Sequence, residues 1–146
     1  MKTYGTKDIR NISLIGHSAS GKSSLAEAMI YTSGVTNRMG KVEDGNMKSD
    51  YLEDEISRQI SIGTSLLQIE WEEKKLNIVD TPGYADFVGE VISGLRAVDA
   101  AVLLVDAVSG LEVGTETSAE LCKKYDKPVF IIINRIGKEH ADLDKV

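Results

Sequence analysis

An eight-residue stretch, Gly16-His17-Ser18-Ala19-Ser20-Gly21-Lys22-Ser23, has the residue types and spacing of a phosphate-binding loop. Successive backbone N–H groups of such a loop converge on an anion, and the following helix adds the positive end of its dipole. Lys22 would reach the outer phosphates of a di- or triphosphate, and the Ser23 hydroxyl would be a ligand of Mg²⁺. The alternative interpretation is a glycine turn between a strand and a helix.

A second motif, Asp80-Thr81-Pro82-Gly83, directly follows the apolar segment 74–79. An acidic residue at the carboxyl end of a hydrophobic strand is placed to hold the Mg²⁺ of a phosphate-loop protein, directly or through water. The N–H of Gly83 is unhindered and could bond a terminal phosphate and sense its loss. By themselves these four residues make a good turn. Behind a phosphate loop, we interpret them as the second half of a nucleotide site.

The elements that would position these motifs alternate between strands and helices. We expect strands over 9–15, 63–71, 74–79, 100–105 and 129–133, and helices after the loop up to residue 34, over 87–95 and over 112–125. The strands 100–105 and 129–133 should be buried, and the last helix should turn Val113, Thr117, Leu121 and Tyr125 inward. This alternation predicts a parallel α/β sheet, whose ligands bind at the carboxyl ends of the strands.

Residues 35–60 form a long polar segment without sustained hydrophobic periodicity. The segment contains Gly40, Gly45 and an acidic cluster over 50–55. Loops of this length inside compact domains are usually functional or mobile. We interpret 35–60 as a switch loop that folds over a bound nucleotide, and a solvated linker is the alternative.

Composition sets the outer limits of the interpretation. A chain of 146 residues with 42% hydrophobic residues fits one domain with its own core. The longest apolar run, 100–105, is too short to cross a bilayer, so we expect a soluble intracellular protein with no membrane partner. Cys122 is the only cysteine and should lie on the buried face of a helix. The net charge of −6 opposes non-specific attraction to nucleic acid, so we expect no nucleic-acid-binding patch.

Several motifs in order along the chain carry a family resemblance. They are the phosphate loop extended to Ser24, the segments Asp50-Tyr51-Leu52-Glu53 and Arg58-Gln59-Ile60-Ser61-Ile62, and the stretches 77–87 and 90–101. With these motifs the chain resembles the G domain of elongation factor G, above all the second-copy elongation factor G-like proteins, which are related to tetracycline-resistance ribosomal protection proteins. The resemblance implies a P-loop NTPase fold (a G domain) with a mostly parallel sheet, one antiparallel hairpin and helices on both faces. It also implies GTP or GDP and Mg²⁺ as ligands, ribosome-stimulated GTP hydrolysis and a cytoplasmic location.

The resemblance extends to single residues of the site. The nucleotide-binding set would be His17, Ser18, Ala19, Ser20, Gly21, Lys22, Ser23, Ser24, Asn134 and Arg135. Ser61 stands where the family has the switch-loop Thr, so Mg²⁺ would be held by Ser23, Ser61 and Asp80. The catalytic set would be Tyr84, Gly83 and Lys22, and His17 receives no catalytic part.

Two positions depart from the pattern of the family. Tyr84 occupies the place of the catalytic His, and a phenol with a pKa near ~10 is a poor base, which predicts weak hydrolysis. The base-reading motif N-K-x-D falls on Asn134-Arg135-Ile136-Gly137. Gly137 offers no carboxylate to the guanine base, so we expect guanine affinity to fall by about ten- to a hundredfold.

The resemblance also implies that residues 1–146 are a single, incomplete G domain, without its last strand and helix and without later domains. Such a piece should leave an apolar sheet edge uncovered, and contact with a ribosome would come through the missing domains. Three functions stay open at this stage: a ribosome-associated GTPase, a guanine-nucleotide-binding module with impaired hydrolysis and weakened base selectivity, and a phosphate-loop kinase. The absence of a basic lid segment counts against the kinase.

Overall fold

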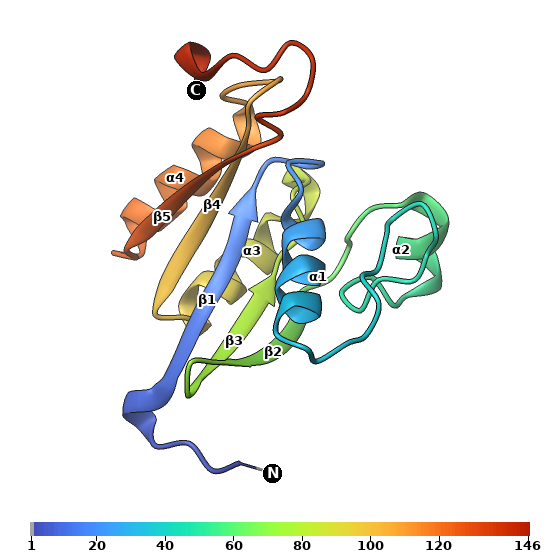
Figure 1. Cartoon of the computed structure of the whole chain (residues 1–146). Coiled ribbons are helices and arrows are strands. Elements are labelled where there is room, and N and C mark those ends of the chain that lie inside the picture. Colours follow the sequence, from blue (N-terminus) through green and yellow to red (C-terminus); the bar gives the residue numbers. More distant parts are fainter. Residues whose placement is uncertain (1) are drawn as a thin grey trace.

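A five-stranded sheet forms the centre of the molecule in the computed structural model (Figure 1). The structure describes residues 2–146; for Lys145 it describes the backbone but not the side chain. The strands are β1 (Ile9–Gly16), β2 (Ser65–Trp71), β3 (Lys74–Asp80), β4 (Ala100–Asp106) and β5 (Val129–Asn134), in the order β2-β3-β1-β4-β5. The β2–β3 pair is antiparallel, and β3–β1, β1–β4 and β4–β5 are parallel. The predicted mostly parallel sheet with one antiparallel hairpin is therefore confirmed.

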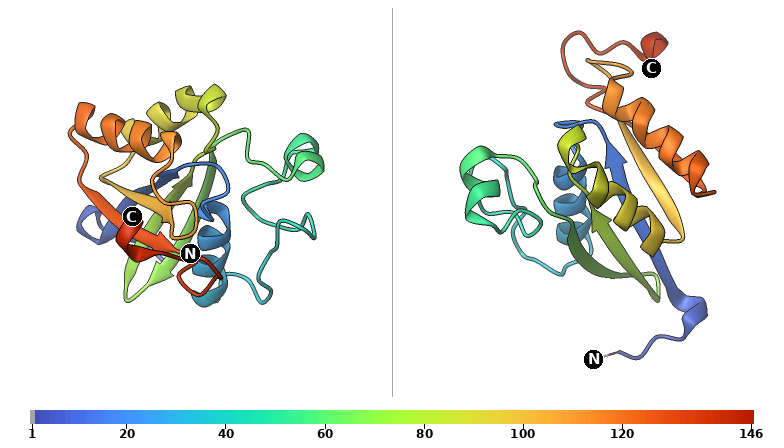
Figure 2. Two further views of the ribbon diagram at one scale, coloured as in Figure 1. Left: turned by 90° about the horizontal axis from the view of Figure 1, so that it is seen from above. Right: turned by 180° about the vertical axis from the view of Figure 1, so that it is seen from behind.

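Helices cover both faces of this sheet. Helix α1 (Lys22–Thr32) packs on one face, and α3 (Val88–Ala97) and α4 (Val113–Lys124) pack on the other (Figures 1 and 2). Successive residues of a strand point to opposite faces, so Leu14 joins the core beneath α1 while Ile15 joins the core beneath α3 and α4. This double burial explains the continuous apolar run 100–105 of β4.

The remaining helices are short. They are three 3₁₀ turns, η1 (Thr6–Asp8), η2 (Ala85–Phe87) and η3 (Leu143–Lys145), and the six-residue helix α2 (Glu53–Arg58). Helix α2 lies within the 35–60 segment, which extends to the side of the sheet beyond α1 (Figure 2). Three acidic residues in its first turn and Arg58 in its last suit the helix dipole. Among the described residues, no helix has both the length and the apolar composition needed to span a membrane.

The buried face of α4 differs from the sequence-based expectation. The prediction that Val113 and Thr117 point inward is wrong, since Val113 is 74% exposed and Thr117 is also exposed. The helix instead buries Thr115, Ser118 and Cys122, so the expected burial of Cys122 is confirmed. The reason is a close backbone approach, because a Cβ at Gly114 would lie 2.9 Å from the Cα of His17.

Strand β5 lies at one edge of the sheet and pairs only with β4. The prediction that it is buried is wrong, since Phe130 is 66% and Ile131 is 59% exposed. A central strand is buried because it has a strand on each side and helices on both faces. Within the described residues, β5 has no strand or helix on its outer side, so its side chains stay exposed. The expected uncovered apolar sheet edge is confirmed.

Candidate nucleotide-binding site

The phosphate loop connects β1 to α1 and takes backbone conformations that favour glycine. Gly16 has a φ of 134° and Gly21 a φ of 98°. A Cβ at Gly16 would lie 2.5 Å from the carbonyl oxygen of Leu104, and one at Gly21 would lie 2.3 Å from Nδ2 of Asn134. Both ends of the loop are thus packed so closely against neighbouring strands that only glycine fits.

Lys22 is the first residue of α1, and its side chain folds back along the loop. Its ammonium group donates hydrogen bonds to the carbonyl oxygens of Gly16 at 3.1 Å and His17 at 2.7 Å. Burial lowers the pKa of Lys22 to about 8, although the charges of Asp80 and Asp50 act in the opposite direction. Burial destabilises the charged form of the Lys22 ammonium, and a bound anion would stabilise that form strongly.

Asp80 ends β3 beneath the same loop and is 2% exposed. Burial raises its pKa to about 7, against the opposing effects of a hydrogen bond with Ser23 and the charge of Lys22. Its Oδ1 atom has no hydrogen-bond partner among the described residues. A buried carboxylate with an unpartnered oxygen demands a cation or a proton.

Two hydroxyl groups complete this corner of the site. The Oγ atoms of Ser23 and Ser61 lie 3.1 Å apart, and Ser61 donates a hydrogen bond of 2.8 Å to Oδ1 of Asp50. Hydroxyl and carboxylate oxygens are ligands that suit Mg²⁺. In residues 2–146, no group of three or more His, Cys, Asp or Glu side chains could hold a metal. The residues present therefore fit Mg²⁺ only together with the oxygens of a bound phosphate.

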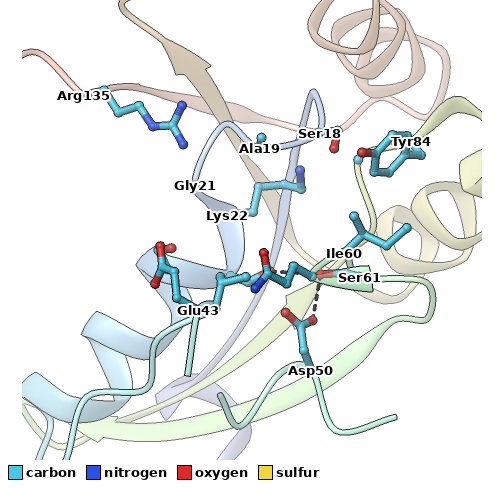
Figure 3. A pocket seen from close by; sticks show the side chains of 15 residues that line it. Ser18, Ala19, Gly21, Lys22, Glu43, Asp50, Ile60, Ser61, Tyr84 and Arg135 are labelled. Atoms are coloured by element: carbon cyan, nitrogen blue, oxygen red, sulfur yellow. Dashed lines mark hydrogen bonds between the residues drawn. The ribbon is translucent and has the colours of Figure 1, made fainter. Parts of the chain in front are cut away.

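A cavity of about 280 Å³ lies between the phosphate loop and the 35–60 segment (Figure 3). The 35–60 segment contributes Val42, Glu43, Asp50, Gln59 and Ile60 to the wall, and Ser61 follows it. The 35–60 segment therefore lies beside the cavity, and its role as a switch loop stays a prediction.

The motif after β3 faces the cavity from the other side. A Cβ at Gly83 would lie 2.4 Å from Nζ of Lys22 and 2.6 Å from the backbone nitrogen of Ser18. Any side chain at Gly83 would therefore enter the phosphate loop. Tyr84 lines the cavity, is 43% exposed, and turns its hydroxyl end toward the loop (Figure 3).

The predicted nucleotide-binding residues divide into two groups. Those that line the cavity are Ser18, Ala19, Gly21, Lys22, Ser23, Ser24 and Arg135. His17 and Ser20 of the loop, and Asn134, do not line it. The His17 ring turns toward the start of α4, where Nδ1 accepts from the N–H of Gly114 at 3.3 Å. The nucleotide-binding roles of all these residues stay predictions.

The expected base-reading residues are engaged within the protein. Asn134 Nδ2 donates to the carbonyl oxygen of Ser20 at 2.9 Å, so the end of β5 braces the phosphate loop. Arg135 donates to Oδ2 of Asp106 at 2.6 Å. A Cβ at Gly137 would have no neighbour within 4 Å. Sequence reasoning missed Asp106, which is 4% exposed, although its place at the carboxyl end of β4 matches that of Asp80 on β3.

Comparisons with known proteins agree with this geometry. The family model described as elongation factor Tu GTP binding domain matches residues 7–146. The chain is 38% identical over 142 residues to elongation factor G of Granulibacter bethesdensis, covering 97% of this chain and 20% of that protein. It is 38% identical over 145 residues to the mitochondrial ribosome-releasing factor 2 of Candida albicans, covering 99% and 18%. The chain thus spans about a fifth of the length of these curated relatives.

Solved structures match as well. A crystal structure of a Thermus thermophilus protein superposes with a TM-score of 0.87 at 34% identity, covering 90% of this chain and 20% of that one. A bacterial selenocysteine-specific elongation factor superposes with a TM-score of 0.72 at 22% identity, which supports the fold alone.

Proposed function

Because the chain belongs to the family of elongation factor Tu GTP-binding domains, we propose that it binds GTP and GDP with Mg²⁺ and is the GTP-hydrolysing module of an elongation factor G-like protein. One observation carries the proposal: Lys22, Ser23 and Ser61 line one cavity directly below the phosphate loop. The names of the relatives, elongation factor G and ribosome-releasing factor 2, support the ribosome as partner. Location in the cytoplasm stays a prediction, because a mitochondrial relative is equally similar.

Different residues of the chain bind different parts of the nucleotide. The backbone N–H groups of the loop bind the inner phosphates, and the ammonium group of Lys22 binds the outer ones. Ser23, Ser61 and Asp80 would hold Mg²⁺, which would supply positive charge against the phosphates. The backbone N–H of Gly83 is available to the end of the phosphate chain, since Gly83 packs against Lys22 and Ser18.

Hydrolysis depends on a water molecule near the last phosphate, and Tyr84 is the side chain that follows Gly83 there. A phenol can donate a hydrogen bond to this water but is a poor base at neutral pH. We therefore expect slow cleavage. The family match supports this hydrolase over a phosphate-loop kinase.

Single-turnover GTP cleavage, with and without ribosomes, tests the proposal. We expect slow cleavage in the unaltered chain and faster cleavage in Tyr84→His. Tyr31→His is the matched control, because Tyr31 is similarly exposed but lies on α1. Fast cleavage by the unaltered chain would contradict the assigned effect of Tyr84, and the absence of nucleotide binding would contradict the proposed function itself.

The second candidate function is a guanine-nucleotide-binding module with impaired hydrolysis and weakened base selectivity. Two observations favour it: the open space at Gly137 and the pairing of Arg135 with Asp106. Tight GDP binding without measurable turnover, also in the presence of ribosomes, would select this candidate.

A further inference from the structure

Two buried carboxylates outside the cavity accept hydrogen bonds from backbone N–H groups of residues 40–63. Glu27 on α1 and Glu55 on α2 are each 1% exposed, and neither lines the phosphate cavity. Among the described residues, neither carboxylate takes part in a salt bridge. Their hydrogen-bond partners are backbone N–H groups, which compensate a buried carboxylate without neutralising it.

Glu27 accepts hydrogen bonds from both ends of the loop over residues 40–49. Its Oε2 atom accepts from the N–H of Gly40 at 3.3 Å. Its Oε1 atom accepts from the N–H groups of Lys48 and, at 3.3 Å, Ser49. A Cβ at Gly40 would lie 2.6 Å from Oε2 of Glu27, so the approach requires glycine. The residue that follows these anchored amides is Asp50.

Glu55 acts in the same way at the other end of the segment. Its Oε2 atom accepts from the N–H of Leu52 at 3.1 Å. Its Oε1 atom accepts from the N–H groups of Ile62 and Gly63, both at 3.0 Å. The residue that precedes these anchored amides is Ser61.

The two carboxylates therefore fix the backbone beside the two partners of one hydrogen bond, Ser61 to Asp50. Ser61 also contacts the hydroxyl of Ser23 at the Mg²⁺ corner of the cavity. We propose that Glu27 and Glu55 are positioning residues that hold Asp50 and Ser61 against Ser23 and thereby set the affinity for Mg²⁺ in the nucleotide complex. This inference rests on the proposed nucleotide function.

Both oxygens of each carboxylate accept hydrogen bonds, and this explains why a carboxylate is required. Glutamine has the same shape but presents one acceptor oxygen and one NH₂ donor. In Glu27→Gln or Glu55→Gln, the NH₂ group would face a backbone N–H, and a buried donor would lose its partner. The loop would then leave its place beside Ser23, while the phosphate loop itself stays unaltered.

The first test titrates Mg²⁺ into the full chain with a fluorescent, non-hydrolysable GTP analogue. In Glu27→Gln and Glu55→Gln we expect the Mg²⁺ concentration for half-maximal binding to rise about tenfold. Binding of the analogue in EDTA should stay unchanged, which separates positioning from general loss of structure. Glu53→Gln is the control, since Glu53 is exposed on the same helix as Glu55.

The second test needs no nucleotide. Hydrogen exchange of the nucleotide-free chain should show faster exchange at Lys48 and Ser49 in Glu27→Gln, and at Ile62 and Gly63 in Glu55→Gln. The amides of β1 and β4 should keep the protection that they have in the unaltered chain. If these sheet amides lose protection in a Gln variant, the Mg²⁺ titration is repeated with Gly40→Ala. This change displaces the loop at residue 40 while both carboxylates remain.

The outcomes separate the two proposals. A raised Mg²⁺ midpoint with faster exchange at the named amides supports the positioning role. An unchanged midpoint in both Gln variants overturns it whatever the exchange shows, and so does an unchanged midpoint in Gly40→Ala. The proposed function survives either result. If the unaltered chain binds no nucleotide in the presence of Mg²⁺, the proposed function fails first.

Discussion

The two ends of the proposed nucleotide site, a phosphate end and a base end, are built differently. At the phosphate end, Lys22 and Asp80 are almost fully buried, and Gly83 leaves no room for a side chain. At the base end, Arg135 pairs with Asp106, and the surroundings of Gly137 are open. The phosphate end depends on backbone groups whose positions the fold fixes, whereas the base end depends on side chains that a single substitution can change.

This difference separates affinity from selectivity. Backbone N–H groups and a buried ammonium recognise any polyphosphate. Recognition of one base requires particular acceptors and donors, and an unpaired partner costs affinity. Substitutions at the phosphate end should therefore weaken all nucleotides equally, and substitutions at the base end should change the ranking of the bases.

The largest effect is expected from Lys22→Met. Loss of the buried ammonium should weaken GTP, GDP and ADP alike by about a hundredfold, roughly 3 kcal/mol, since charge-assisted bonds to phosphate disappear. Isothermal titration calorimetry measures this loss. Lys123→Met, an exposed change on α4, is the control and should bind as the unaltered chain does. If Lys22→Met binds the nucleotides as tightly as the unaltered chain, Lys22 does not bind their phosphates.

Gly137→Asp should increase the selectivity of the base end for guanine. Nothing lies within 4 Å of a Cβ at this position, so the new carboxylate enters without a clash. We expect the preference for GDP over ADP to rise about ten- to a hundredfold, because the carboxylate accepts from the guanine edge. Competition titrations with both nucleotides measure the ratio, and Gly137→Asn controls for bulk. A strong preference for GDP that is already present with Gly137 would refute this part.

Gly83→Ala tests the packing between the two motifs. Its Cβ would lie 2.4 Å from Nζ of Lys22, so the ammonium or the loop must move. We expect GTP affinity to fall about tenfold. Gly89→Ala is the matched control, because its Cβ would meet nothing and alanine should stabilise α3 by about 0.5–1 kcal/mol. If both variants bind GTP equally well, the close packing at Gly83 has no functional consequence.

The last prediction concerns the pH dependence of folding rather than nucleotide affinity. Folding raises the pKa of Asp80 from 3.8 to about 7, so between these values the folded state binds more protons than the unfolded state. The free energy of unfolding of the nucleotide-free chain should therefore fall as pH rises through this window, by at most about 1.4 kcal/mol per unit. Lys22, whose pKa falls from 10.5 to about 8, should reverse the trend above pH 8. Urea unfolding at several pH values measures both slopes.

Asp80→Asn should reduce the acidic slope to what Asp50 contributes, because burial raises the pKa of Asp50 as well. Asp86→Asn, an exposed change in η2, should retain the full slope. The same slope in both variants would show that another group causes it.

Local patterns predicted the phosphate end well. The loop motif lies within eight residues, and the turn of the β2–β3 hairpin falls at Glu72 and Glu73 as expected, where both residues have positive φ. Where burial depends on distant neighbours, the prediction failed: β5 has the composition of a central strand but lies at an edge. Helix α2 was missed because six residues are too few for a periodic signal.

The supporting residues of the site could not be found in the sequence. Glu27 bonds amides 13 to 22 positions away, and Asp106 pairs with Arg135 29 positions away. A single acidic residue in a helix carries no mark of such partners, because only the fold brings them together. Asp80 was found because it ends an apolar strand next to a recognisable turn.

The most direct test of the account separates the two ends of the ligand. Calorimetric titrations in Mg²⁺ would compare inorganic tripolyphosphate with guanosine on the unaltered chain. The account predicts that tripolyphosphate binds and competes with GDP, while guanosine alone binds weakly or not at all. Binding of guanosine as tight as that of GDP, with no binding of tripolyphosphate, would contradict it.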